Sequence, residues 1–218
     1  DKLYDRRLLA TVYTTDRANA YNVQTRFINT ANRVVAQKRR LQPGSVPVSM
    51  HDVLLHVPKD EIYVSGMNLE AEYRRCVVLK DFEALSRLLA LQLKFLLKEA
   101  LGGEASDNPV AEEIKPEFFD CIPSNLILHD GSLFYIDREW QVKKQVCLGV
   151  LLLRTVDALH ELDKYAPELS RENLIGILGR LGFEIGTEII EEYDVLIAEV
   201  DAQVYSGANL DSAHVSVL

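Results

Sequence analysis

The chain has 218 residues, of which 48% are hydrophobic and 26% are charged, and its formal net charge at pH 7 is −9. This length suits one domain, or two small lobes, with a sizeable hydrophobic core. The acidic balance argues against nucleic acid or an anionic membrane as the main partner, because both reward an excess of Lys and Arg. No apolar stretch approaches the ~18 residues of a transmembrane helix, and no signal peptide is visible.

The three cysteines, Cys76, Cys121 and Cys147, are widely spaced and form neither a CxxC pair nor a Cys/His cluster. We therefore expect reduced thiols in a cytoplasmic protein, rather than a zinc site or a disulfide. The chain begins with Asp1 inside what reads as structured sequence, so we interpret it as a piece of a longer polypeptide.

The N-terminal part of the chain is predicted to form strands. Leu8–Thr14 is apolar and rich in β-branched residues, and residues 21–28 alternate in hydrophobicity. A turn then leads to a return strand over residues 33–41, in which Lys38 falls on the same face as Ala36.

The middle of the chain changes from loop to helix. Residues 42–58 contain three prolines and lack sustained periodicity, so we expect a loop there. Residues 61–66 read as a short strand that ends in a turn. Residues 69–101 have helical spacing, which we divide into two helices with Asp81 as the N-cap of the second.

The remainder is a linker, a hairpin and further helices. Residues 104–115 are polar and acidic, so we expect a surface linker. After a short hairpin, one helix is predicted over residues 142–162. A second helix is predicted to begin at an N-cap within residues 170–173, and a third to cover residues 187–206. Residues 207–218 are expected to be a frayed tail.

This order of elements predicts an α+β protein. A small β lobe with a hinge would occupy residues 1–66, and a larger helical lobe with the hairpin would occupy residues 67–218. An all-helical interaction domain that carries a single hairpin is a weaker alternative.

The most informative segment is residues 119–140, FDCIPSNLILHDGSLFYIDREW. Asp120 precedes Asn125 by five residues, and Asp137 follows the predicted hairpin. A loop and a hairpin can bring these three oxygen-bearing side chains together, which suits Mg²⁺ and the phosphates it carries. The alternative is that Asp120 and Asn125 cap a turn, as such residues commonly do.

The string DCIPSN resembles the catalytic loop of protein-kinase-like phosphotransferases, in which a catalytic Asp precedes a metal-binding Asn by five residues. Asp137 occupies the place of the aspartate in the kinase metal-binding triplet, and Val35-Ala36-Gln37-Lys38 resembles the strand motif that carries a phosphate-binding lysine. The resemblance implies a two-lobe, aminoglycoside-phosphotransferase-like fold, with a small, reduced antiparallel β N-lobe and a larger, mainly helical C-lobe.

The same resemblance implies a role for each polar residue. Asp120 would be catalytic and would accept or orient the proton of an attacking hydroxyl. Asn125 and Asp137 would hold Mg²⁺ against the phosphates of ATP, and Lys38 would neutralise the α and β phosphates. Asn125 and Asp137 are thus the expected metal ligands. The expected cofactor-binding residues are Lys38, Asn125 and Asp137.

A narrower resemblance comes from the pattern D-x-x-P-x-N, a hairpin, and I-D-x-E-W. It is similar to kinase-like domains attached to bacterial polysaccharide (O-antigen) methyltransferases and glycosyltransferases, and it rests on Glu139 and Trp140, the strand at residues 25–27 and a hinge at residues 63–66. It implies ATP- and Mg²⁺-dependent phosphoryl transfer to a hydroxyl of a small molecule or saccharide, such as a bacterial surface glycan. The resemblance also implies that this chain is fused to methyltransferase or glycosyltransferase domains that act in polysaccharide biosynthesis.

The sequence departs from the kinase pattern at several positions. Phe118-Phe119 stands where kinases have His-Arg, and the metal-binding triplet is Asp137-Arg138-Glu139. No G-x-G-x-x-G loop precedes Lys38, and no helix offers a Glu to pair with it, which leaves Asp52 and Glu61 as substitutes.

These departures motivate a second hypothesis, a catalytically inactive kinase-like module that binds or scaffolds within a larger glycan-modifying protein. Glu139 is either a third carboxylate on the metal side or a structural ion-pair partner. Trp140 is interpreted as core packing.

Overall fold

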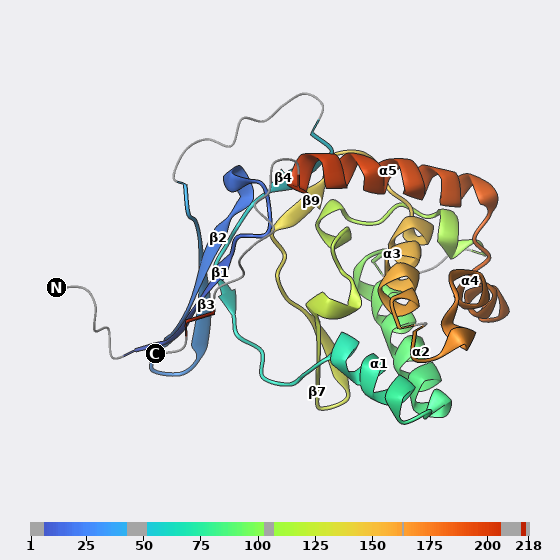
Figure 1. Ribbon diagram of the computed structural model, residues 1–218, viewed down its shortest axis with the longest axis horizontal. Coiled ribbons are helices and arrows are strands. Elements are labelled where there is room, and N and C mark those ends of the chain that lie inside the picture. The colour runs from blue at the N-terminus through green and yellow to red at the C-terminus, as the bar shows by residue number, and fades with distance from the viewer. Residues whose placement is uncertain (1–6, 43–51, 103–106, 163, 206–214, 217–218) are drawn as a thin grey trace. The chain divides into compact units, whose positions relative to one another are not determined.

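The computed structural model describes residues 7–42, 52–102, 107–162, 164–205 and 215–216 (Figure 1). Over these residues the protein is mixed α+β, with three small antiparallel sheets and a set of helices. The chain divides into two compact units. Unit 1 comprises Asp1–Val64, Asp137–Lys143 and Leu196–Leu218, and unit 2 comprises Ser65–Ile136 and Lys144–Val195. The division is discontinuous in sequence, whereas the predicted lobes were continuous.

Unit 1 contains a five-stranded sheet with the order β10-β1-β2-β3-β5. Its strands are β1 (Leu8–Thr14), β2 (Val23–Asn29), β3 (Val34–Arg40), β5 (Glu61–Ile62) and β10 (Val215–Ser216). The predicted strands at the N-terminus are therefore confirmed. The prediction of a frayed tail is wrong for Val215–Ser216, because these residues pair with β1. Residues 206–214 and 217–218 lie outside the described residues.

A second, two-stranded sheet in unit 1 joins segments far apart in sequence. β4 (Leu54–His56) pairs antiparallel with β9 (Trp140–Val142), so that His56 lies opposite Trp140. Gln203 supports this sheet, because its side chain accepts from the Leu54 amide and donates to the Leu54 carbonyl, both at 2.9 Å. The expected loop over residues 42–58 is wrong where β4 forms, and residues 43–51 lie outside the described residues.

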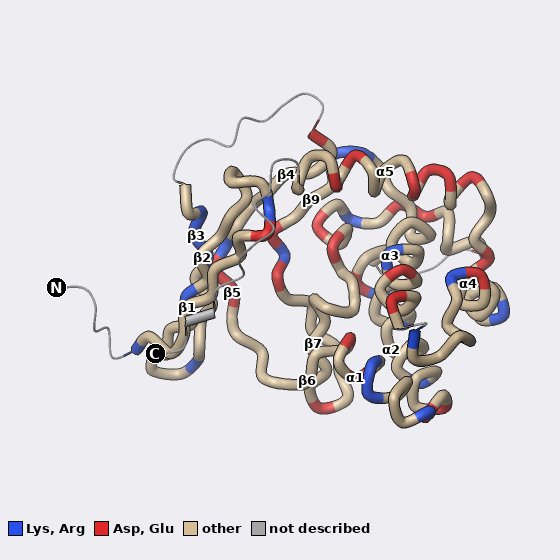
Figure 2. Tube along the Cα trace, in the orientation of Figure 1, with Lys and Arg blue, Asp and Glu red and all other residues tan. Residues whose placement is uncertain are grey.

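Unit 2 is built mainly from helices. They are α1 (Leu69–Val78), α2 (Phe82–Glu99), α3 (Leu148–His160) and α4 (Arg171–Arg180), and α5 (Thr187–Tyr205) passes from unit 2 into unit 1. Asp81 accepts from the Ala84 amide and Ser170 from the Asn173 amide, which confirms both predicted N-caps. Figure 2 shows acidic residues recurring along α5.

The predicted helix over residues 142–162 begins later than expected, at Leu148. Val142 belongs to β9 instead, and its apolar side chain is buried there. The expected surface linker over residues 104–115 is also partly wrong, because Val110 and Ile114 are buried and the Ile114 amide donates to Val146. Residues 103–106 lie outside the described residues.

The hairpin of unit 2 forms a three-stranded sheet with a short N-terminal strand. The strands are β6 (Met67–Asn68), β7 (Leu126–His129) and β8 (Ser132–Tyr135), in the order β6-β7-β8. Short 3₁₀ helices complete the chain: η1 (Asn19–Tyr21), η2 (Pro109–Ala111), η3 (Pro116–Phe118), η4 (Pro123–Asn125) and η5 (Pro167–Leu169). The strands exclude the all-helical alternative.

The core of unit 2 is centred on α3, which is apolar on nearly all sides. Among its fully buried side chains are Leu148, Leu151, Leu152 and Leu153. Within the described residues, no helix combines the length and apolar character that crossing a membrane requires.

Candidate functional site

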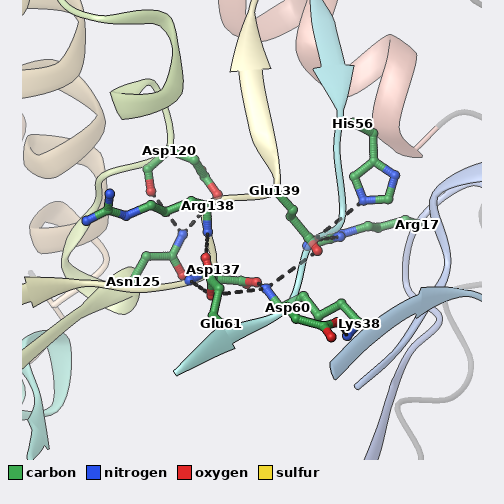
Figure 3. A network of polar contacts seen from close by, with 10 residues as sticks. All are labelled: Arg17, Lys38, His56, Asp60, Glu61, Asp120, Asn125, Asp137, Arg138 and Glu139. Atoms are coloured by element: carbon green, nitrogen blue, oxygen red, sulfur yellow. Dashed lines mark hydrogen bonds and ion pairs between the residues drawn. The ribbon is translucent and has the colours of Figure 1, made fainter. Parts of the chain in front are cut away.

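Three carboxylates of unit 1 surround the ammonium group of Lys38 (Figure 3). Lys38 forms an ion pair with Asp137, and its Nζ lies 3.7 Å from Glu61 Oε2 and 3.7 Å from Glu139 Oε2. The Lys38 side chain is only 6% exposed. A buried ammonium needs such partners, because burial of an unpaired charge is strongly unfavourable.

The sheet register explains why Glu61 reaches Lys38. Glu61 of β5 lies opposite Ala36 of β3, and Lys38 is two residues further along the same strand. Side chains two positions apart project from the same face, so Glu61 and Lys38 are diagonal neighbours across the strand pair. Glu61, one of the two predicted substitutes for a kinase helix glutamate, thus lies within ion-pair distance of the lysine.

Asp137 occupies a tight turn between β8 and β9. Its φ angle is 59°, in the left-handed region that Asp tolerates better than most residues, and the Glu139 amide donates to its carbonyl at 2.8 Å. Its side chain is 36% exposed, against 4% for Glu139. Of the two, Asp137 is therefore the carboxylate that a cation from solvent can reach.

Glu139 is a buried ion-pair partner. Its carboxylate bonds to Arg17, and His56 Nε2 lies 3.8 Å from its Oε1. Burial by itself would raise the pKa of Glu139, but the neighbouring His56 ring and the charges of Arg17 and Lys38 outweigh it and lower that pKa to about 2. These contacts favour the structural reading of Glu139.

Trp140 is buried within unit 1, as interpreted from the sequence. Its ring stacks on His56 at a centroid distance of 4.4 Å and lies 5.3 Å from the Tyr21 ring. The Arg17 guanidinium also lies over Trp140, 5.3 Å from its centroid. Arg17 is in the connection between β1 and β2, so this connection is tied to Glu139 and Trp140.

In unit 2, Asp120 and Asn125 lie together, with Arg154 as a third member. Asn125 Nδ2 donates to Asp120 Oδ2 and to the Asp120 carbonyl, both at 2.9 Å, and Arg154 Nη2 donates to Asp120 Oδ1 at 2.6 Å. The loop is tied to the hairpin, because the Ile136 amide donates to the Asn125 carbonyl at 2.9 Å. Both carboxylate oxygens of Asp120 therefore have a donor.

Phe118 and Phe119 occupy the positions of His-Arg in the kinase pattern, and both are buried. The Arg154 guanidinium lies 4.5 Å from the centroid of Phe119. The positive charge beside Asp120 thus comes from α3 rather than from the loop. Sequence reasoning missed Arg154, although an arginine in the apolar run Leu148–His160 was a usable signal.

The four predicted site residues fall into two pairs. Lys38 and Asp137 meet in unit 1, and Asp120 and Asn125 meet in unit 2, since the division falls between Ile136 and Asp137. With Asn125 Nδ2 directed at Asp120, its Oδ1 is the remaining side-chain donor atom for a cation.

The donor set suits a hard cation better than a transition metal. In the described part of the chain, no group of three or more His, Cys, Asp or Glu side chains could hold a metal ion. Mg²⁺ does not require such a group, because it is commonly held by one or two carboxylates together with phosphate oxygens and water. Asp137 in unit 1 and Asn125 in unit 2 each carry an oxygen atom that could bind such a cation.

Comparisons with protein-family models, with curated proteins and with solved structures found no match. The functional proposals below therefore depend on the residues and geometry just described.

Proposed function

We propose that this chain is a protein-kinase-like phosphotransferase module that transfers a phosphoryl group from Mg·ATP to a hydroxyl. The acceptor class is a small molecule or saccharide, and a bacterial surface glycan fits the sequence pattern best. The observation that carries the proposal is the Lys38–Asp137 ion pair, which joins a strand lysine to the carboxylate that follows the hairpin. In this proposal unit 1 is the β N-lobe and unit 2 the helical C-lobe.

The charges around Lys38 support a site for Mg·ATP. Glu61, Asp137 and Glu139 contribute three negative charges, against the two positive charges of Lys38 and Arg17. The surplus negative charge favours a cation at Asp137, the exposed carboxylate. With Asp137 engaged by a cation, Lys38 would be available to neutralise the charge of the α and β phosphates.

The same proposal assigns the remaining roles to residues in the loop of unit 2. Asn125 would contribute its Oδ1 to the cation, and Asp120 would orient the acceptor hydroxyl and accept its proton. When bound, Mg²⁺ neutralises the charge that develops on the β and γ phosphates. The protein contributes mainly positioning and charge stabilisation, so no covalent enzyme intermediate is required.

Thermal unfolding with nucleotide tests the proposal. Mg·ATP at ~100-fold above its Kd should stabilise the wild-type protein by about 2.7 kcal/mol and raise its Tm. Asp137→Asn should abolish the Mg²⁺-dependent part of this rise, and Lys38→Met should weaken ATP binding with or without Mg²⁺.

Asp130→Asn is a matched control. Asp130 also has a positive φ, 48°, but lies at the exposed hairpin turn, so its substitution should leave the rise intact. The proposal is wrong if neither ATP nor GTP, with Mg²⁺ or Mn²⁺, shifts the wild-type melt at millimolar concentration.

A specific observation favours a second candidate, an inactive kinase-like binding or scaffolding module. Both carboxylate oxygens of Asp120 are engaged, by Asn125 and by Arg154, so a base role requires one of these bonds to open. Radiolabelled γ-phosphate in a saccharide acceptor, absent with Asp120→Asn, would exclude this candidate. Nucleotide-dependent stabilisation without transfer to any saccharide acceptor would favour it.

A further inference from the structure

We propose that Glu61 is a positioning residue that holds Lys38 and the Asp137–Arg138 turn with one carboxylate. The proposal rests on the phosphotransferase function above and deepens it. Glu61 would set the geometry of the two groups that receive the nucleotide phosphates and their cation, without touching either.

The first support is a pair of backbone hydrogen bonds. Glu61 Oε2 accepts from the Asp137 amide at 2.8 Å, and Glu61 Oε1 accepts from the Arg138 amide at 2.9 Å. Both oxygens of one carboxylate are thus directed at successive amides of the turn. Hydrogen bonds from amides to an ionised carboxylate are shorter and stronger than neutral ones.

The second support is the conformation of the turn. Asp137 has a φ of 59°, which an L-residue other than glycine adopts at an energetic cost. Kinase-like triplets carry a glycine nearby, whereas this one continues with Arg138 and Glu139. The two hydrogen bonds that Glu61 accepts offset the energetic cost of this φ angle. They also keep the Asp137 carboxylate beside Lys38.

The third support is the contact with Lys38 itself. Glu61 Oε2 lies 3.7 Å from Lys38 Nζ, and the Glu61 side chain is 16% exposed. The same oxygen therefore faces the lysine and the Asp137 amide. Because all these residues belong to unit 1, the arrangement is internal to that unit.

The neighbouring Asp60 provides a matched control. Asp60 is exposed and accepts from the Lys38 amide at 3.3 Å. Asp60 thus contacts the backbone of the same lysine, whereas Glu61 contacts the ammonium group of that lysine. Asp60→Asn retains an oxygen acceptor for that amide and should leave the turn unchanged.

Residue-resolved amide hydrogen exchange is the first experiment, because it does not depend on activity. In the wild-type protein, the Asp137 and Arg138 amides should be protected. Glu61→Gln, which keeps one oxygen acceptor, should raise their exchange rates about tenfold, and Glu61→Ala should raise them further. Asp60→Asn should leave both rates within about twofold.

Nucleotide binding is the second experiment. Glu61→Gln should raise the Kd for Mg·ATP about tenfold and raise the Mg²⁺ concentration that gives half of the nucleotide-induced melting shift. A merely structural residue would lower the Tm of the unliganded protein and leave both quantities unchanged. That result would overturn the proposal.

The two experiments separate the possible failures. Unprotected Asp137 and Arg138 amides in the wild-type protein, or rates unchanged in Glu61→Gln, would overturn the role of Glu61 even if Mg·ATP binds. Protected amides in a protein that binds no nucleotide would show that the phosphotransferase proposal fails and, with it, the role of Glu61 at a nucleotide site. The wild-type measurement remains decisive if the Glu61 variants do not fold.

Discussion

Arg154 of α3 donates a hydrogen bond of 2.6 Å to the carboxylate of Asp120, 34 residues earlier in the chain. The side chains are only 15% and 16% exposed, respectively, and the Arg154 guanidinium also packs over Phe119. The loop DCIPSN is therefore anchored to the most buried helix of unit 2 by a charged pair. An ordinary solvated turn would not need such an anchor.

Replacing Arg154 should destabilise unit 2 measurably. Arg154→Gln removes the charge-assisted bond to a largely buried carboxylate, so we expect a loss of about 1–3 kcal/mol in the free energy of unfolding. Urea denaturation measures this loss. Arg87→Gln removes an exposed i,i+4 pair with Glu83, so it should change stability by less than about 0.5 kcal/mol. Equal losses for the two variants would contradict the anchoring role.

Two glycines in helices should respond to alanine with opposite signs. At Gly149 in α3, a Cβ would lie 2.8 Å from Val110 Cγ1 and 2.9 Å from Ile189 Cγ2. We expect Gly149→Ala to destabilise by about 1–3 kcal/mol through overpacking. At Gly176 in α4, the nearest atom would be Arg180 Nη1 at 3.7 Å, which is an ordinary contact.

Gly176→Ala should therefore stabilise by about 0.5–1 kcal/mol, because alanine has the higher helix propensity. Thermal melts of the two single variants compare the signs directly. A gain in stability for Gly149→Ala would contradict the overpacking of a Cβ against Val110 and Ile189.

Local sequence patterns predicted most of the elements correctly. The β-branched composition of β1, the alternation in β2 and β3, and the N-caps Asp81 and Ser170 are properties of a few neighbouring residues. The structure confirms these strands and both caps. The pairing of β4 with β9 was missed because each strand has three residues and its partner is over 80 residues away. Because of the same pairing, Val142 lies in β9 and not in the predicted helix.

The polar partners of the candidate site were predictable only in part. The resemblance to short kinase motifs singled out Lys38, Asp120, Asn125 and Asp137, because each motif consists of a few neighbouring residues. Arg17 and Arg154 contact their carboxylates across 122 and 34 residues, respectively. No periodicity encodes such contacts, since they depend on how the elements pack.

A buried chain of hydrogen bonds links three helices of unit 2. The Tyr73 hydroxyl donates to Gln92 Oε1 at 2.7 Å, and Gln92 Nε2 donates to Thr155 Oγ1 at 3.0 Å. All three side chains are almost fully buried. Burial raises the pKa of Tyr73, so its hydroxyl stays protonated and remains a donor at any ordinary pH.

Tyr73→Phe should cost about 1–3 kcal/mol of stability, because it leaves the buried Gln92 oxygen without its donor. In a Gln92→Leu background the same change should cost less, since that oxygen is already gone, and the coupling free energy should be about 0.5–3 kcal/mol. A double-mutant cycle by urea denaturation measures this coupling. Strictly additive losses would show that the two side chains do not interact.

His56 is a buried histidine held between an aromatic stack and charged groups. Its ring stacks on Trp140, Glu139 lies on one side, and the charges of Arg17 and Arg40 are nearby. Burial lowers the pKa of His56 below its ordinary value of 6.5, and the two arginines lower it further, while Glu139 only partly opposes this effect. The folded protein therefore holds His56 neutral at pH 7.

This lowered pKa gives stability a definite pH dependence. As the pH falls below 6.5, the unfolded chain binds a proton at His56 before the folded chain does, so stability decreases, by at most about 1.4 kcal/mol per pH unit. Glu139 adds a loss only below pH ~4.5, because its folded pKa is about 2. His56→Phe keeps a stacked ring without a titrating group, so the variant lacks this loss of stability at low pH. The unfolding free energy of the variant minus that of the wild type should therefore become more positive from pH 7 to pH 5. Urea denaturation across this range measures the difference, and parallel curves would mean that His56 titrates alike in the folded and unfolded chains.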